Sequence, residues 1–105
     1  MNVYKVVATP KAREDLKRYA GYLKNVKKNP QAARNVIDDF LSTKEELAKV
    51  AGSVQEAQSE KLQSLGLKRL NFQKHDYFLL FQFDGNIVKI TNMFHASEDY
   101  ERKLN

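Results

Sequence analysis

The sequence of 105 residues contains no cysteine, which excludes disulfide bonds, thiolate metal sites and cysteine nucleophiles. Two histidines alone argue against a structural zinc site, and no metal-ligand spacing, phosphate-binding glycine loop or nucleophile elbow is present. Only four glycines and two prolines occur, and the apolar residues fall in periodic runs, which argues against disorder. The sequence therefore predicts one ordered domain spanning residues 1–105 that uses no cofactor.

No apolar run is long enough to span a membrane, and the N-terminus lacks the layout of a signal peptide. We therefore expect a cytoplasmic protein without a membrane partner. The 18 Lys and Arg residues exceed the 13 Asp and Glu residues, so the net charge is +5. This surplus suits nucleic acid or an acidic protein partner, but a net charge of about 2–8 is also ordinary for a small soluble domain. Charge alone does not decide between these interpretations.

Two proline-containing segments predict the starts of two amphipathic helices. Thr9 and Asn29 are good N-cap residues, and each precedes a proline, which favours the first helical turn. Apolar residues then recur at intervals of three and four, and Gly52 is placed to cap the second helix. The apolar stripe of the first helix consists of Ala12, Leu16, Tyr19, Ala20, Leu23 and Val26. Its opposite face carries the polar residues Lys11, Arg18 and Asn25.

The rest of the chain favours β-structure. Residues 3–8, 67–72, 77–83 and 87–94 read as strands, and the segment 77–83 is apolar enough to be central in the sheet. Residues 53–64 fit either a short helix that begins with a capping box at Ser53 or a polar connection. Tyr100 and Leu104 are placed to dock a last helical turn. The predicted fold is α+β: a strand, two helices packed on one sheet face, a three-stranded antiparallel meander, and a short C-terminal helix or tail.

Polar and ionisable side chains gather near the ends of the predicted meander. They are Lys68, Arg69, Lys74 and His75 on its first strand and turn, and His95, Glu98 and Tyr100 after its last strand. Because the first and third strands flank the second, we expect these groups to converge on one concave face. RNA cleavage without a metal needs a base, an acid and a cation for the developing phosphorane charge. Lys68 or Arg69 would supply the cation, and His95, Glu98 or Tyr100 would transfer protons.

Each of these residues also has a purely structural interpretation. Lys68 and Arg69 fit a solvated strand face, and His75 fits an exposed turn. His95 fits a polar strand end, and the Tyr100 ring can cover the edge of the core while its hydroxyl stays hydrated. The spacing by itself leaves both interpretations open.

Several segments, in order along nearly the whole chain, resemble the RelE/ParE superfamily, the toxins of type II toxin–antitoxin modules. The matching segments are residues 4–12 with Asp15-Leu16, Leu67-Lys68-Arg69-Leu70, Tyr77 and Phe81 in the central strand, and residues 90–95 with Asp99-Tyr100. The resemblance implies a strand–two-helix–three-strand fold. It also implies a cognate antitoxin, a small protein that wraps around the toxin and neutralises it.

The resemblance also implies roles for individual residues. RelE-like members cut messenger RNA in the ribosomal A site, whereas ParE-like members poison DNA gyrase. In RelE-like toxins, basic residues on the middle strands and a tyrosine after the last strand carry out cleavage. Arg69 and Tyr100 match these positions, and His95 lies where many relatives also have histidine. The predicted catalytic residues are therefore Arg69, His95 and Tyr100, and the predicted RNA-phosphate-binding residues are Lys68, Lys74 and His75.

Three positions depart from the pattern of the cleaving relatives. Phe78 and Ala96 stand where these relatives often carry arginine, and Asn71 stands where some carry lysine. Each lost donor typically costs about 10²–10³ in rate at comparable sites. The leading hypothesis is a toxin that cleaves messenger RNA on the ribosome. The alternatives are a gyrase poison that uses the helical hairpin as its contact surface, and a degenerate toxin that only binds its antitoxin.

Overall fold

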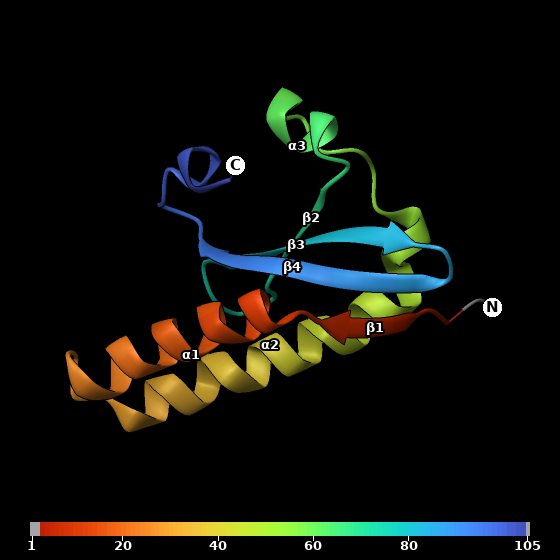
Figure 1. Ribbon diagram of the computed structural model, residues 1–105. Coiled ribbons are helices and arrows are strands. Elements are labelled where there is room, and N and C mark those ends of the chain that lie inside the picture. Colours follow the sequence, from red (N-terminus) through yellow and green to blue (C-terminus); the bar gives the residue numbers. More distant parts are fainter. Residues whose placement is uncertain (1–2, 105) are drawn as a thin grey trace.

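The computed structural model describes residues 3–104, so residues 1, 2 and 105 of the predicted domain lie outside the described residues. A four-stranded sheet is covered on one face by a helical hairpin (Figure 1). The elements are β1 (Lys5–Ala8), α1 (Pro10–Asn25), α2 (Pro30–Val50), the 3₁₀ helix η1 (Ala51–Ser53), α3 (Glu60–Ser64), β2 (Lys68–Asn71), β3 (Tyr77–Asp84), β4 (Ile87–His95) and the 3₁₀ helix η2 (Tyr100–Lys103).

Both long helices begin where the sequence predicts. The Thr9 hydroxyl accepts a hydrogen bond from the Ala12 N–H at 3.3 Å, and the Asn29 side chain accepts one from the Ala32 N–H at 3.0 Å. Each proline occupies the first turn, where its missing N–H is not needed. The Thr9 hydroxyl also donates to the carbonyl of Ile90 at 2.8 Å. This cap therefore fixes the start of α1 against β4.

The predicted role of Gly52 as a helix cap is wrong. α2 ends at Val50, its C-cap Ala51 keeps right-handed helical dihedrals, and Gly52 lies within η1 without a positive φ. A Cβ atom at Gly52 would instead collide with the hydroxyl of Tyr4, whose backbone N–H donates to the carbonyl of Ala48 at 2.8 Å. The glycine therefore allows a close approach between the start of the chain and the end of α2.

Residues 53–64 combine the two alternatives left open by the sequence. The capping box at Ser53 is not used, because Ser53 ends η1 and residues 54–58 have no regular structure. The short helix α3 begins later, where the Ser59 hydroxyl accepts a hydrogen bond from the Leu62 N–H at 3.2 Å. Leu62 is buried and Leu65 is exposed. A connection therefore leads into a single short helix.

The sheet has the strand order β1-β4-β3-β2, which confirms β3 as an internal strand between the two others of the meander. β2, β3 and β4 are antiparallel, and β1 pairs in parallel with β4. A register irregularity between Leu80 and Phe81 interrupts the pairing of β3 with β4. The predicted α+β fold is confirmed, and the parallel edge strand makes the sheet a mixed one.

Two apolar clusters fill the two faces of the sheet. On the hairpin face, covered by α1 and α2, side chains such as Phe40, Leu79 and Ile90 are buried. The distal face carries a smaller cluster beneath α3 and η2, formed by Leu62, Leu67, Phe78, Leu80, Phe94 and Leu104. Tyr100 packs against this cluster, so the predicted docking of a last helical turn is confirmed. Among the described residues, no helix is both long and apolar enough to cross a membrane.

Candidate functional site

Strand alternation divides the predicted catalytic residues between the two faces of the sheet. Arg69 and Tyr100 both pack on the Phe78 ring, which belongs to the distal face. The ring of His95 lies 5.0 Å from the ring of Tyr77, which packs with the hairpin-face cluster. The expected convergence on one concave face is therefore wrong, because successive side chains of a strand point to opposite faces.

Arg69 and Tyr100 line a cavity of about 810 Å³ beside the edge strand β2. The guanidinium carbon of Arg69 lies 3.7 Å from the centroid of the Phe78 ring, and its Nε donates to Asn71 Oδ1 at 2.8 Å. The Tyr100 ring packs edge-on against Phe78 with a centroid separation of 5.1 Å. Two carboxylates, those of Glu46 and Glu56, line the same cavity. Their negative charge opposes the binding of an RNA phosphate there.

His95 lies at the end of β4, on the rim of a different cavity of about 410 Å³. Its Nδ1 accepts the N–H of Ser97 at 3.1 Å and lies 2.7 Å from the Ser97 hydroxyl. Tyr19 and Tyr77 form the aromatic wall of this cavity, and their rings meet edge-to-face at 5.2 Å. The imidazole is thus held by its own turn and by aromatic contacts, away from Arg69.

Lys74 and His75 lie in the turn between β2 and β3, where both contact Asp39 of α2. The buried Asp39 carboxylate accepts the Lys74 N–H at 3.1 Å and lies 2.7 Å from His75 Nδ1. Both residues also line a cavity of about 310 Å³ that includes Tyr77 and His95. The structure therefore brings Lys74 and His75 to the same side as His95, with the turn tied to the helical hairpin.

Lys68 is adjacent to Arg69 in sequence but faces the other side of the sheet. Its Nζ donates to the carbonyl of Val54 at 2.9 Å and lies 5.8 Å from the centroid of the Phe83 ring. The ammonium group therefore holds the segment after η1 against the sheet. The six predicted site residues thus divide into three groups: Arg69 with Tyr100, His95 with Lys74 and His75, and Lys68.

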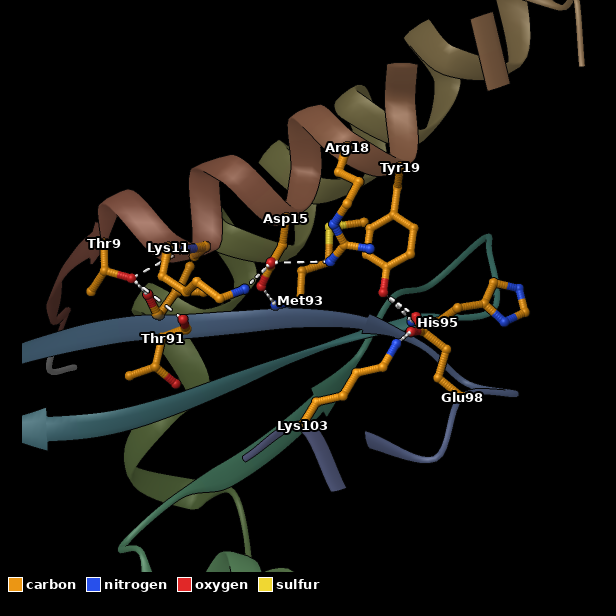
Figure 2. Close-up of polar contacts among 12 residues, drawn as sticks. Thr9, Lys11, Asp15, Arg18, Tyr19, Thr91, Met93, His95, Glu98 and Lys103 are labelled. Atoms are coloured by element: carbon orange, nitrogen blue, oxygen red, sulfur yellow. Dashed lines mark hydrogen bonds and ion pairs between the residues drawn. The ribbon is translucent and has the colours of Figure 1, made fainter. Parts of the chain in front are cut away.

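The carboxylate of Glu98 is the centre of a polar cluster at the end of β4, shown in Figure 2. It accepts the His95 N–H at 2.9 Å, the hydroxyl of Tyr19 from α1 and the ammonium of Lys103 from η2. The spacing placed Tyr19 in the apolar stripe of the first helix and predicted no role for its hydroxyl. Since 79 residues separate Tyr19 from Glu98, no local pattern could have paired them.

These contacts shift the pKa values of both groups in opposite directions. Burial acts to raise the pKa of Glu98, but the hydrogen bonds from Lys103, Tyr19 and the His95 N–H outweigh it and lower the pKa to about 2. Burial, reinforced by the hydrogen bond to Glu98, raises the pKa of the Tyr19 phenol well above its usual range. The cluster therefore holds a carboxylate and a neutral phenol at physiological pH, which is a structural tie rather than a proton-transfer pair.

We expect this tie to weaken in acid. Because the pKa of Glu98 is lowered by folding to about 2, its stabilisation is fully present above about pH 5 and is lost as the pH falls through 2. Urea unfolding of the wild type and Glu98→Gln should differ by about 1–2 kcal/mol at pH 7, after allowance for solvent screening, and by much less near pH 2. Glu101→Gln, at an exposed position of η2, is the control; a difference for Glu98→Gln that does not change with pH would contradict the prediction.

Asp15 is a second polar residue whose importance the sequence did not reveal. It lies on α1 with only 1% of its surface exposed, and one carboxylate oxygen accepts the Met93 N–H of β4 at 3.0 Å (Figure 2). Its other oxygen pairs with Lys11 and with Arg18, the latter at 3.2 Å. The face predicted to be polar therefore packs on β4 through a carboxylate that is paired with two cations. In the sequence, the positions of Lys11 and Arg18, four residues before and three residues after Asp15, could have indicated this ion pairing.

Comparisons with known proteins agree with this architecture. A family model described as ParE toxin of type II toxin-antitoxin system, parDE, matches residues 6–100. Because this match spans most of the chain, the protein belongs to the ParE toxin family, within the RelE/ParE superfamily. No curated protein matches the sequence.

Two solved structures share the fold. The structure described as "Chromosomal ParDE TA system from P. aeruginosa" has a TM-score of 0.72 and 21% sequence identity, covering 90% of this chain and 98% of that chain. A toxin-antitoxin complex, RelBE2 from Mycobacterium tuberculosis, has a TM-score of 0.55 and 22% identity, covering 89% of this chain and 98% of that chain. At these identities the likeness establishes the fold alone.

Proposed function

We propose that this ParE-family toxin arrests growth by acting on DNA gyrase through a protein surface, without cleaving RNA. The observation that carries the proposal is the separation of His95 from Arg69 and Tyr100 by the sheet. Groups on opposite faces cannot act on the same phosphodiester, since general acid–base catalysis requires contact with the reacting atoms. The match to the ParE family model supports the same conclusion.

Neutralisation by a cognate antitoxin belongs to the same proposal. The relative from M. tuberculosis is described as a toxin-antitoxin complex, and the relative from P. aeruginosa as a chromosomal ParDE TA system. The net charge of +5 favours an acidic partner segment. The alternative of messenger RNA cleavage has one observation in its favour, because Arg69 and Tyr100 share a cavity of about 810 Å³.

Pulse labelling after controlled induction of the toxin in a bacterium tests the proposal. We expect incorporation of thymidine to fall before incorporation of methionine. The combined variant Arg69→Ala, His95→Ala and Tyr100→Phe should keep at least about half of the growth arrest, because its residues are not needed for a protein contact. The Tyr100→Phe change keeps the ring packing on Phe78.

A second variant, Lys24→Glu, tests the hairpin surface, because Lys24 lies at an exposed position on the hairpin. It should reduce the arrest, because it reverses the charge of the proposed contact surface. If methionine incorporation falls first, or if the combined variant is inactive while it remains folded, RNA cleavage replaces gyrase as the function. If wild type changes neither incorporation, the protein only binds its antitoxin.

A further inference from the structure

A groove of about 520 Å³ runs between α1 and α2 on the outer side of the hairpin. Arg13, Lys17, Ala20 and Lys24 of α1 line it and lie about half a helical turn away from Asp15, whose carboxylate contacts β4. The groove therefore faces away from the strand on which α1 packs. Both helices are regular along it, so its shape does not depend on a loop.

Small residues create the hollow. Ala20 and Gly21 of α1 face Ala33 of α2, and a Cβ atom at Gly21 would have only the Asn25 amide nitrogen near it, at 4.0 Å. The floor is completed by the apolar side chains of Leu16 and Ile37. The groove is thus an apolar channel that is deep because the residues between the two helices are alanine and glycine.

The apolar surface continues beyond the groove. Leu41 lies one helical turn after Ile37 on α2, and half of its surface is exposed. A large apolar side chain in this position extends the floor along α2. An extended apolar stripe beside a groove is the surface expected for a docked amphipathic helix.

Four cationic side chains line the groove: Arg13, Lys17 and Lys24 from α1, and Arg34 from α2. Its described lining contains no Asp or Glu. Arg13 donates to the carbonyl of Ala8 at 3.1 Å and Arg34 to the Gln31 side chain at 2.8 Å, both neutral acceptors. Among residues 3–104, none of the four forms an ion pair. Their charge is therefore available to a partner.

We infer that this groove binds an acidic amphipathic helix of the protein on which the toxin acts. The apolar stripe of such a helix would cover the floor, and flanking Asp or Glu side chains would meet the four cations. Nucleic acid fits less well, because the described lining holds no aromatic ring on which a base could stack. The inference rests on the proposed function, under which the helix belongs to gyrase.

Two groove variants and one control test the inference. Gly21→Leu fills the channel, and its fold is protected because leucine is the better helix former. The double variant Lys17→Glu with Arg34→Glu reverses two charges at exposed positions and leaves the floor unchanged. Lys49→Glu, at an exposed position of α2 outside the groove, is the control for a charge reversal elsewhere on the hairpin. Thermal unfolding by circular dichroism confirms that each variant is folded.

The first measurement is fluorescence anisotropy with a synthetic helical peptide of about 15 residues, long enough for four turns, with a leucine stripe flanked by glutamates. The wild type and Lys49→Glu should bind it equally, and the two groove variants at least about tenfold more weakly. The affinity should fall with rising salt. Equal binding of a lysine-flanked version of the peptide, or unchanged binding by Gly21→Leu, would overturn the inference.

The second measurement is inhibition of purified gyrase, with binding of the cognate antitoxin followed in parallel. The inference is supported if both groove variants lose inhibition at least about tenfold and still bind the antitoxin. If they inhibit as the wild type does, the inference fails and the proposed function stands. If they lose antitoxin binding instead, the antitoxin occupies the groove and the inference is wrong. If the wild type does not inhibit gyrase, the proposed function fails, and the assignment of the helix to gyrase fails with it.

Discussion

Replacing Asp15 with alanine should lower the free energy of unfolding by about 2–4 kcal/mol. The larger part, about 1–3 kcal/mol, comes from the Met93 N–H, which would stay buried without an acceptor. The ion pairs with Lys11 and Arg18 add less, because these cations are more than half exposed and return to water when the carboxylate is removed. Urea denaturation followed by circular dichroism measures the change.

Two variants separate the hydrogen bond of Asp15 from its charge. Asp15→Asn retains an oxygen that can accept the Met93 N–H, so we expect about half of the loss seen for alanine. Glu14→Ala changes an exposed carboxylate on the same turn of α1 and should stay within about 0.5 kcal/mol of wild type. A loss for Asp15→Ala no larger than that for Glu14→Ala would show that α1 does not depend on this link to β4.

Phe78→Arg should prevent stable folding, although arginine is what cleaving relatives often carry after the tyrosine at the start of the central strand. Phe78 is fully buried in the distal cluster, and Arg69 lies directly over its ring at 3.7 Å. Arginine there would lose the aromatic packing, worth about 3–5 kcal/mol in truncation, and would bury a cation next to the partly exposed guanidinium of Arg69. The total is comparable with the whole stability of a small domain, about 5–15 kcal/mol.

Thermal unfolding by circular dichroism is the measurement, with Phe78→Leu as the control that keeps an apolar side chain. We expect Phe78→Leu to fold and to lose about 1–2 kcal/mol, because it leaves only part of the ring volume empty. A cooperative transition for Phe78→Arg near the wild-type temperature would mean that the distal face can open to water.

Local patterns were sufficient to predict most of the backbone. Thr9-Pro10 and Asn29-Pro30 set the helix starts, since capping and proline geometry act within four residues. The apolar run in residues 77–83 predicted an internal strand, because a strand with one hydrated face cannot be so apolar. Residues 53–64 were less predictable, since the capping box at Ser53 is not used and the short helix begins at Ser59 instead. The burial of Leu62 in the distal cluster favours the helix that begins at Ser59.

The site was less predictable than the fold, because it depends on which face of the sheet each side chain occupies. Neighbours on a strand point to opposite faces, so the register of pairing decides whether His95 and Arg69 meet. Arg69 pairs with Leu80 and His95 pairs with Tyr77, and these two β3 residues are three positions apart, so they point to opposite faces. For this reason the strands were predicted correctly, whereas the expected convergence of His95 and Arg69 on one face was wrong.

The sequence by itself determined the order of the elements, the helix starts, the internal strand and the family, because all of these depend on residues close together in the chain or on the order of short motifs. Only the tertiary structure decided the burial of Asp15 against the Met93 N–H of β4, the tie between Tyr19 and Glu98, and the close approach at Gly52. These contacts join segments distant in sequence. Their energies depend on desolvation and on atomic distances, which exist only once the helical hairpin has packed on the sheet.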